Sequence, residues 1–272
     1  MGNRWSGPER VPEQIPSLAA GTPRCYLSGM KVRLRADRLL VERGLFSSRA
    51  KAQAAIAAGL VTANAALVRK ASDEIPVDAR LRARPEHPWV SRAGAKLAAA
   101  LDHFRIDPRG RVCLDVGAST GGFTDVLLSR GARLVYAVDV GRDQLDVRLR
   151  QRPEVISFEQ TDIRTLDPRR LAEPPDLIVV DVSFISLELV LPAALRLARS
   201  CAVLVALIKP QFEAGPRNVR KGVVRDAAVQ ASVCEEIADL VASLGWKLDG
   251  VLPSPVLGRE GNREFLVGAR HD

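Results

Sequence analysis

Short apolar runs alternate with amphipathic stretches from residue 111 to the end of the chain. The apolar runs predict strands, and the stretches between them carry apolar residues at the spacing of one helix face. The predicted strands are 112–116, 134–138, 155–158, 177–181, 203–208, 247–252 and 264–268. The predicted helices are 121–130, 143–151, 186–199 and 226–244. This alternation predicts an α/β fold with a doubly wound, mostly parallel sheet.

A different pattern occupies residues 31–84. Two segments with helical spacing, "RADRLLVERGL" and "SSRAKAQAAIAAG", end at Gly44 and Gly59. Ser47 or Ser48 is the expected N-cap of the second helix. The segment "LVTANAALVRK" then predicts a short hairpin. Residues 31–84 are therefore expected to form a small α+β domain.

The other boundaries follow from composition. Residues 1–30 are rich in Pro, Gly and Ser without a period and are expected to be a disordered extension. Residues 85–90 contain two prolines and predict a linker. Ser91 is expected to cap a helix, "SRAGAKLAAALDHF", that opens the α/β domain at 91–272.

The positive charge of the chain is concentrated in the small domain. Residues 31–84 hold 12 Lys+Arg against 5 Asp+Glu, whereas residues 85–272 hold 25 of each. A basic module attached to a neutral domain indicates RNA or DNA binding, although a well-solvated basic surface is the alternative. The candidate contacts are Arg33, Arg35, Arg38, Arg49, Lys51, Arg69 and Lys70.

Cysteine usage and hydropathy place the chain in a reducing cytoplasm. Cys25, Cys113, Cys201 and Cys234 have no metal-ligand spacing, and we expect buried free thiols and no metal site. No uncharged apolar run is long enough for a transmembrane helix, and the first residues do not resemble a signal peptide.

A glycine-containing turn joins the first strand of the α/β domain to the next helix, in "VCLDVGASTGGFTDVLL". Gly117 and Gly121 are expected to allow a tight turn and the close approach of a ligand. Ser119 stands where a dinucleotide-binding loop has a second glycine, and no lysine follows at P-loop spacing. Phosphate binding by this loop is therefore not expected.

Three carboxylates follow successive strands at the same edge, namely Asp115, Asp139 and Asp162. They suit an adenosyl ligand with a cationic amino-acid part, and they would repel a dinucleotide pyrophosphate. Asp139 stands where a carboxylate would bind the hydroxyls of a ribose. Structural caps and turn aspartates are the alternative interpretation.

Four charged residues occupy matching positions beside apolar segments. Asp181 ends "LIVVD", Lys209 ends "VLVALIK", Glu264 opens the last strand, and Lys96 lies on the helix before the first strand. Strand carboxyl ends meet on the ligand side of an open sheet, so Asp181 and Lys209 should be neighbours. Glu264 can join them only if its strand is antiparallel. Two partly desolvated lysines could provide a base, whereas a plain salt bridge is the alternative.

These motifs resemble the TlyA family, also labelled hemolysin A, over residues 31–272. The matching stretches are "RADRLLVERGLFSSRAKAQAAIAAGLV", "WVSRAGAKL", "CLDVGASTGGFTDVLL", "DLIVVDVSFISL", "LIKPQFE" and "GNREFL". The resemblance implies an S4-type RNA-binding domain followed by a Rossmann-like, FtsJ-like methyltransferase domain with a seven-stranded sheet. It implies S-adenosylmethionine as cofactor and 2′-O-ribose methylation of cytidine in 23S or 16S ribosomal RNA. Ribosomal RNA or ribosomal subunits are then the expected partners.

The same resemblance assigns residues. It implies that Lys96, Asp181, Lys209 and Glu264 form a catalytic tetrad, and that "HPWV", 87–90, is an interdomain linker associated with cofactor binding. The implied cofactor residues are Asp115, Gly117, Ser119, Gly121, Gly122, Phe123, Asp139, Asp162 and Asp181.

One departure concerns the hairpin of the small domain, which has Asn64–Ala65 where the family usually has Asn-Gly. This turn should fit a type I′ geometry less comfortably. Three alternative functions remain open at this point: a non-catalytic RNA-binding or ribosome-assembly factor, a membrane-active hemolysin and a nicotinamide oxidoreductase. The intact tetrad, the strand-length apolar runs and the Ser119 loop, respectively, argue against them.

Overall fold

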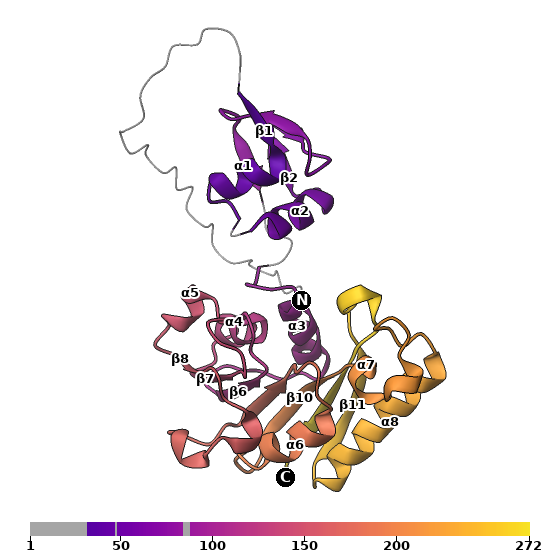
Figure 1. Cartoon of the computed structure of the whole chain (residues 1–272). Helices are drawn as coiled ribbons and strands as arrows, with labels where there is room; N and C mark the ends of the chain where they lie inside the picture. The colour runs from indigo at the N-terminus through magenta and orange to yellow at the C-terminus, as the bar shows by residue number, and fades with distance from the viewer. Residues whose placement is uncertain (1–31, 47, 84–87) are drawn as a thin grey trace, which may run out of the picture. The chain divides into compact units, whose positions relative to one another are not determined.

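The computed structural model describes residues 32–46, 48–83 and 88–272 (Figure 1). Residues 1–31, 47 and 84–87 lie outside this description, and with them the extension predicted at 1–30. The chain divides into two compact units, Met1–Arg84 and Pro85–Asp272. A small α+β region therefore precedes the larger unit, as the sequence predicts.

The described part of the first unit contains two short helices and five short strands. They are β1 (Arg33–Arg35), α1 (Ala36–Glu42), α2 (Arg49–Ala57), β2 (Val61–Ala63), β3 (Ala66–Leu67), β4 (Glu74–Pro76) and β5 (Leu81–Ala83). Strands β1 and β4 pair, and β2 lies between β3 and β5 in a second small sheet. Apolar side chains of both helices and of β2 form the core of this unit.

The hairpin of the first unit keeps a two-residue turn despite its alanine. Ala63 pairs with Ala66, and the turn residues Asn64 and Ala65 have φ of 50° and 67°. Both central residues of a type I′ turn need positive φ, which alanine adopts at a cost.

The second unit is built on one seven-stranded sheet. Its strands are β6 (Val112–Val116), β7 (Leu134–Val138), β8 (Val155–Phe158), β9 (Leu177–Val180), β10 (Val203–Ile208), β11 (Lys247–Pro253) and β12 (Phe265–Arg270). They lie in the order β11-β12-β10-β9-β6-β7-β8. Neighbouring strands from β10 to β8 are parallel, and β12 is antiparallel to both β10 and β11. The predicted mostly parallel sheet is confirmed.

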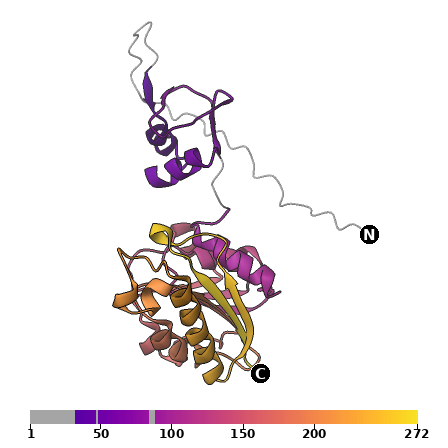
Figure 2. The ribbon, with the colours of Figure 1, turned by 90° about the vertical axis from the view of Figure 1, so that its right-hand side faces the viewer.

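Helices cover both faces of this sheet (Figures 1 and 2). One face packs against α6 and α8, and the other against α3 and α4. The α-helices of the unit are α3 (Ala93–His103), α4 (Gly122–Ser129), α5 (Val147–Arg150), α6 (Leu187–Leu195), α7 (Pro210–Glu213) and α8 (Ala227–Ser243). Short 3₁₀ turns are η1 (Ile163–Thr165), η2 (Pro168–Arg170), η3 (Pro216–Asn218) and η4 (Arg259–Gly261).

Two predictions about local structure need correction. The helix predicted at 143–151 is reduced to α5, because residues 143–145 donate their amides to the Glu159 side chain instead of starting a helix. The sequence pattern also does not predict helix α7, which begins at Pro210 directly after Lys209. Proline is well suited to the first turn of a helix.

Of the three cysteines in the described residues, one has the buried thiol that the sequence predicts. Cys113 is buried in β6, but Cys201 is exposed in the turn before β10, with φ of 60°. Cys234 on α8 is half-buried, and Cys25 lies outside the described residues. None of the described helices has the length and apolarity that crossing a bilayer demands.

Candidate active site

A cleft of about 880 Å³ opens at the carboxyl ends of the parallel strands. The loops after β6, β7, β8, β9 and β10 form its walls, together with the start of α3 and the turn before β12. Ligands of open parallel sheets bind at this edge. The predicted site residues that line the cleft are Lys96, Gly117, Ser119, Gly122, Phe123, Asp139, Asp162, Asp181, Lys209 and Glu264.

The glycine turn after β6 is held in place by the two neighbouring strands. Gly117 has φ of 83°, and a Cβ there would lie 2.5 Å from the backbone oxygen of Asp181. The amide of Ser119 donates to Asp139 Oδ2 at 2.8 Å. The turn therefore depends on the ends of β7 and β9 for its shape.

Gly121 lies in the same turn but does not line the cleft. Its φ is 94°, and a Cβ there would lie 2.3 Å from Leu149 and 2.8 Å from Leu145. The absence of a side chain at Gly121 thus lets the turn pack against the segment around α5.

The three aspartates that line the cleft have different partners. Asp139 accepts backbone amides on both oxygens, including that of Gly141 at 2.7 Å, which leaves lone pairs for hydroxyl donors. Asp162 caps η1 and pairs with Arg164 at 2.6 Å. Asp181 pairs with a lysine. Among these three, Asp139 is the carboxylate best suited to bind the hydroxyls of a ribose.

Asp115 is fully buried in β6 and does not line the cleft. Its Oδ2 accepts the Thr124 hydroxyl at 2.6 Å, and its Oδ1 has no hydrogen-bond partner among the described residues. Burial raises the pKa of Asp115 to about 7, with the charges of Asp181 and Asp139 adding to the effect. Asp115 thus braces the start of α4 and lies beneath the glycine turn.

The four charged residues of the predicted tetrad meet as two ion pairs. Lys96 on α3 pairs with Glu264, and Lys209 Nζ lies 2.6 Å from Asp181 Oδ1. Both lysines and Glu264 are buried. Glu264 reaches this edge because β12 is antiparallel, which is the condition set by the sequence analysis. Each lysine is therefore paired with a carboxylate.

Two polar residues of the site escaped the sequence analysis. Lys209 Nζ donates to Ser183 Oγ at 2.8 Å, and Gln211 Nε2 donates to Glu264 Oε1 at 3.5 Å. Both also line the cleft. The sequence feature that could have indicated them is their spacing, because Ser183 lies two positions after Asp181 and Gln211 two positions after Lys209.

An aromatic pair lies at the rim of the cleft, with Phe184 exposed and Phe212 half-buried. Phe184 is 86% exposed and has φ of 66°, an uncommon conformation for a bulky residue. Its ring lies 5.0 Å, centroid to centroid, from that of Phe212 on α7. The sequence signal was a phenylalanine in the turn directly after Asp181, in "DVSFISL".

The end of the predicted linker belongs to the second unit and packs against its helices. Val90 is buried beside Ala118 of the glycine turn, and its amide donates to Asp125 Oδ2 at 2.8 Å. The Trp89 side chain lies so close to Gly94 that a Cβ there would be 2.9 Å away. These contacts tie residues 89 and 90 to the first turns of α3 and α4, which border the cleft.

The predicted RNA-binding residues of the first unit are exposed, but several have protein partners. Arg38 pairs with Glu42 at 2.7 Å, and Arg33 donates to the backbone oxygen of Glu74. Arg35 and Arg49 share one acidic partner. The described structure holds no side-chain partner for Lys51, Arg69 and Lys70.

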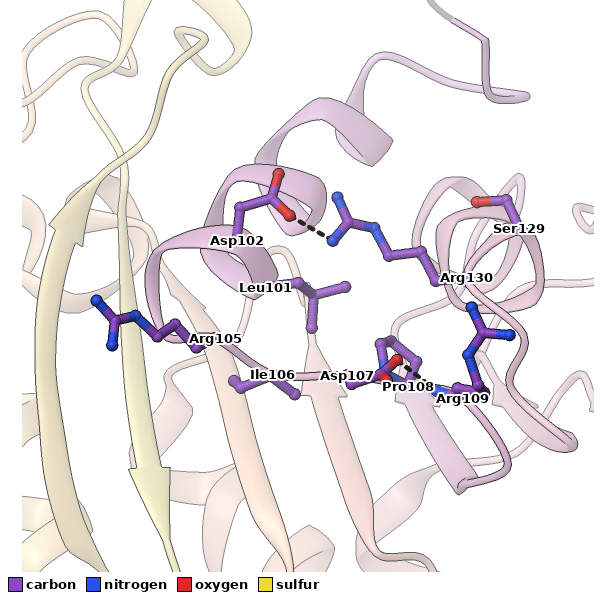
Figure 3. A pocket seen from close by; sticks show the side chains of 9 residues that line it. All are labelled: Leu101, Asp102, Arg105, Ile106, Asp107, Pro108, Arg109, Ser129 and Arg130. Carbon is purple, nitrogen blue, oxygen red and sulfur yellow. Dashed lines mark hydrogen bonds and ion pairs between the residues drawn. The ribbon is translucent and has the colours of Figure 1, made fainter. Parts of the chain in front are cut away.

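A second hollow, of about 470 Å³, lies at the opposite edge of the sheet, where β6 and β7 begin (Figure 3). It is lined by the end of α3, the following loop and the end of α4, and Arg130 pairs with Asp102 across it. No residue of the predicted tetrad lines this hollow.

Comparisons with known proteins agree with this geometry. The FtsJ-like methyltransferase family model matches residues 89–271. The 16S/23S rRNA (cytidine-2′-O)-methyltransferase TlyA of Mycobacterium tuberculosis is 43% identical over 89% of this chain and 91% of the relative. Hemolysin A of Brachyspira hyodysenteriae is 37% identical over 86% of this chain and 98% of the relative. The structure of a hemolysin candidate from Streptococcus thermophilus has a TM-score of 0.70 and 39% identity over 89% of this chain and 90% of that one.

Fold and cleft define the class of protein as an S-adenosylmethionine-dependent methyltransferase. The residues that the family model matches, 89–271, include all four members of the two ion pairs. The chain belongs to the TlyA, or hemolysin A, family of FtsJ-like methyltransferases.

Asp115 predicts a pH dependence of folding stability. The folded protein keeps a proton that the unfolded chain releases near pH 4, so the contribution of Asp115 to stability falls as pH rises to about 7. Asp115→Asn removes this loss. We expect the stability of the variant relative to wild type to rise by about 3 kcal/mol between pH 5 and pH 8.

Urea unfolding of the cofactor-free protein at several pH values measures this difference. Asp249→Asn, at an exposed ion pair on β11, is the control and should show no comparable trend. A difference between Asp115→Asn and wild type that does not change with pH would show that Asp115 is ionised in the folded protein at pH 5.

Proposed function

We propose that this chain methylates the ribose 2′-hydroxyl of cytidine in ribosomal RNA. The observation that carries the proposal is the meeting of two lysine–carboxylate pairs, Lys96–Glu264 and Lys209–Asp181, in a cleft beside the glycine turn. The name of the Mycobacterium tuberculosis relative, an rRNA (cytidine-2′-O)-methyltransferase, supports the substrate class. The proposed substrate is ribosomal RNA, either free or in ribosomal subunits, and the proposed location of the protein is the cytoplasm.

The residues of the cleft fit S-adenosylmethionine. Asp139 would bind the ribose hydroxyls, and Asp162 and Asp181 would favour a ligand with cationic groups. The backbone of the glycine turn, at Gly117 and Ser119, would lie against the ligand. When bound, the cofactor supplies a methyl group activated by attachment to a positively charged sulfur.

Lys209 is the proposed acceptor of the hydroxyl proton. Contacts with Asp181 Oδ1 at 2.6 Å and Ser183 Oγ at 2.8 Å fix its nitrogen at the cleft edge. In its neutral form the amine takes the proton as the ribose oxygen gains the methyl group. Asp181 then stabilises the ammonium that is formed. Alignment of the hydroxyl with the donor supplies much of the rate.

Lys96 and Glu264 form the opposite side of the proposed catalytic centre. They come from α3 and from the turn before β12. Lys96 pairs with Oε2 of Glu264, and Gln211 donates to the other oxygen, Oε1, at 3.5 Å. We propose that this pair orients the ribose hydroxyl toward Lys209.

Phe184 is the proposed contact for the target base. Its ring is exposed at the rim and supported from one side by Phe212. An aromatic face so placed can stack on a base that has left its RNA helix, an arrangement that sequence-specific RNA recognition often uses.

The first unit is the proposed anchor on ribosomal RNA. Its basic surplus would bind phosphates and make affinity fall steeply with salt, with little dependence on base sequence. We propose that residues 31–84 are an S4-type RNA-binding domain, that 85–90 are the linker and that 91–272 are the methyltransferase domain.

Lys209→Ala tests the proposed base. Loss of the proton acceptor should lower methyl transfer to unmodified ribosomal subunits by at least about 100-fold. Cofactor affinity should change little, because the carboxylates and the glycine turn remain. Transfer of labelled methyl groups measures the first effect and calorimetry the second.

Lys247→Ala is the matched control, because Lys247 is exposed at the opposite edge of the sheet. A Lys209→Ala protein that methylates subunits at the wild-type rate would exclude Lys209 as the base. Thermal unfolding of the variant shows whether the loss of activity is a loss of folding.

Phe184→Ala tests the proposed base contact. Stacking of a base on an aromatic ring contributes about 1–3 kcal/mol, so kcat/KM for the RNA should fall by about 5- to 150-fold. Phe184→Tyr should retain most of the wild-type kcat/KM, because its aromatic ring can still stack on a base. Folding stability should not fall, because the side chain is exposed.

Steady-state methylation assays with all variants provide the measurement. Leu189→Ala, a change of an exposed apolar residue on α6, is the control. Equal kcat/KM values for Phe184→Ala, Leu189→Ala and wild type would rule out the contact.

A further inference from the structure

One buried carboxylate in the first unit binds two arginines from different elements. Asp37, in the first turn of α1, is fully buried. Arg35 Nε lies 3.1 Å from Oδ1, and Arg35 Nη2 lies 3.2 Å from Oδ2. Arg49, at the start of α2, places Nη2 2.8 Å and Nε 3.2 Å from Oδ2. Gln53, one turn further along α2, donates to the same oxygen at 2.7 Å.

Both guanidinium groups turn the same edge toward Asp37. Each uses Nε and Nη2 for this carboxylate, and a guanidinium has five N–H donors in a planar fork. The donors on Nη1 therefore remain available in both arginines. The side chains are 47% exposed for Arg35 and 57% exposed for Arg49, so both remain open to solvent while they are bound to Asp37.

The net charge of this cluster is positive, since one carboxylate holds two guanidinium groups. Hydrogen bonds from Arg35, helped by those from Gln53 and Arg49, hold the pKa of Asp37 well below its usual range. The carboxylate is therefore ionised at any pH at which the protein works. A free arginine on a surface would move through many rotamers, whereas these two are fixed.

We propose that Arg35 and Arg49 form a clamp for backbone phosphates of RNA, and that Asp37 is the positioning residue that holds the clamp open. Paired guanidinium groups match the oxygens of a phosphate, and fixing them in advance lowers the ordering that binding requires. The inference rests on the proposed function, in which the first unit binds ribosomal RNA.

The position of Asp37 is unusual for a face that binds a polyanion. A negative charge among seven predicted phosphate contacts weakens the general attraction for RNA. If charge alone mattered, its removal would strengthen binding. If geometry matters, its removal would weaken binding, so the two explanations predict opposite signs.

Asp37→Asn and Glu42→Gln provide the comparison in the full-length protein. Each change removes one negative charge from α1, but Glu42 is exposed and contacts only Arg38 among the described residues. Binding to an unmodified 23S ribosomal RNA transcript is measured at several salt concentrations. We expect Glu42→Gln to bind as tightly as wild type or more tightly, and Asp37→Asn to bind at least 5-fold more weakly.

A further variant, Arg49→Lys, tests the clamp if Asp37→Asn fails to fold. Arg49→Lys keeps the charge but not the planar fork, and it leaves Arg35 and Gln53 bound to Asp37. We expect severalfold weaker RNA binding at an unchanged unfolding temperature. Wild-type affinity for Arg49→Lys, or tighter binding for a folded Asp37→Asn, would overturn the clamp.

Failure of the clamp and failure of the proposed function give different results. The double variant Lys51→Gln/Lys70→Gln removes two exposed charges outside the clamp. One outcome is that the double variant binds RNA more weakly, with a smaller dependence of affinity on salt, while Asp37→Asn behaves like Glu42→Gln. In that case the clamp is wrong and the first unit is still the RNA anchor. If the double variant, Asp37→Asn and Arg49→Lys all leave RNA affinity unchanged, the first unit is not the RNA anchor and both proposals fail.

Discussion

Two lysine ammonium groups buried at one edge of an apolar sheet are the constraint on which the second unit depends. A charge removed from water is costly unless it is paired, so each lysine needs a carboxylate close by. Asp181 meets this need from the neighbouring parallel strand, and Glu264 meets it only because β12 is antiparallel. The reversed strand thus serves the site as well as the sheet.

The same edge also shapes the cofactor cleft. The backbone of Asp181 lies against Gly117, so the residue that pairs with Lys209 also limits what can occupy position 117 of the glycine turn. Asp139 holds the turn through the Ser119 amide. The proposed catalytic and cofactor residues are therefore parts of one connected structure, joined through Asp181.

The sequence predicted the strands well because each is an unbroken apolar run, and strand ends then located Asp181 and Lys209. The sequence also showed that Glu264 could join them only from an antiparallel strand. It could not show which carboxylate would pair with which lysine. It also placed Asp115 in the cleft, since a strand pattern does not say which side chains point beneath the turn. In the first unit the surplus of arginine was visible, but the capture of Arg35 and Arg49 by Asp37 depends on tertiary contact between α1 and α2.

The position of the transferred methyl group tests the central claim most directly, because the proposal assigns the two ion pairs to a ribose hydroxyl. Unmodified ribosomal subunits are incubated with the protein and methyl-labelled S-adenosylmethionine, and the RNA is digested to nucleosides. The account predicts label in 2′-O-methylcytidine. Label in a base-methylated nucleoside, or no label in either subunit, would contradict it.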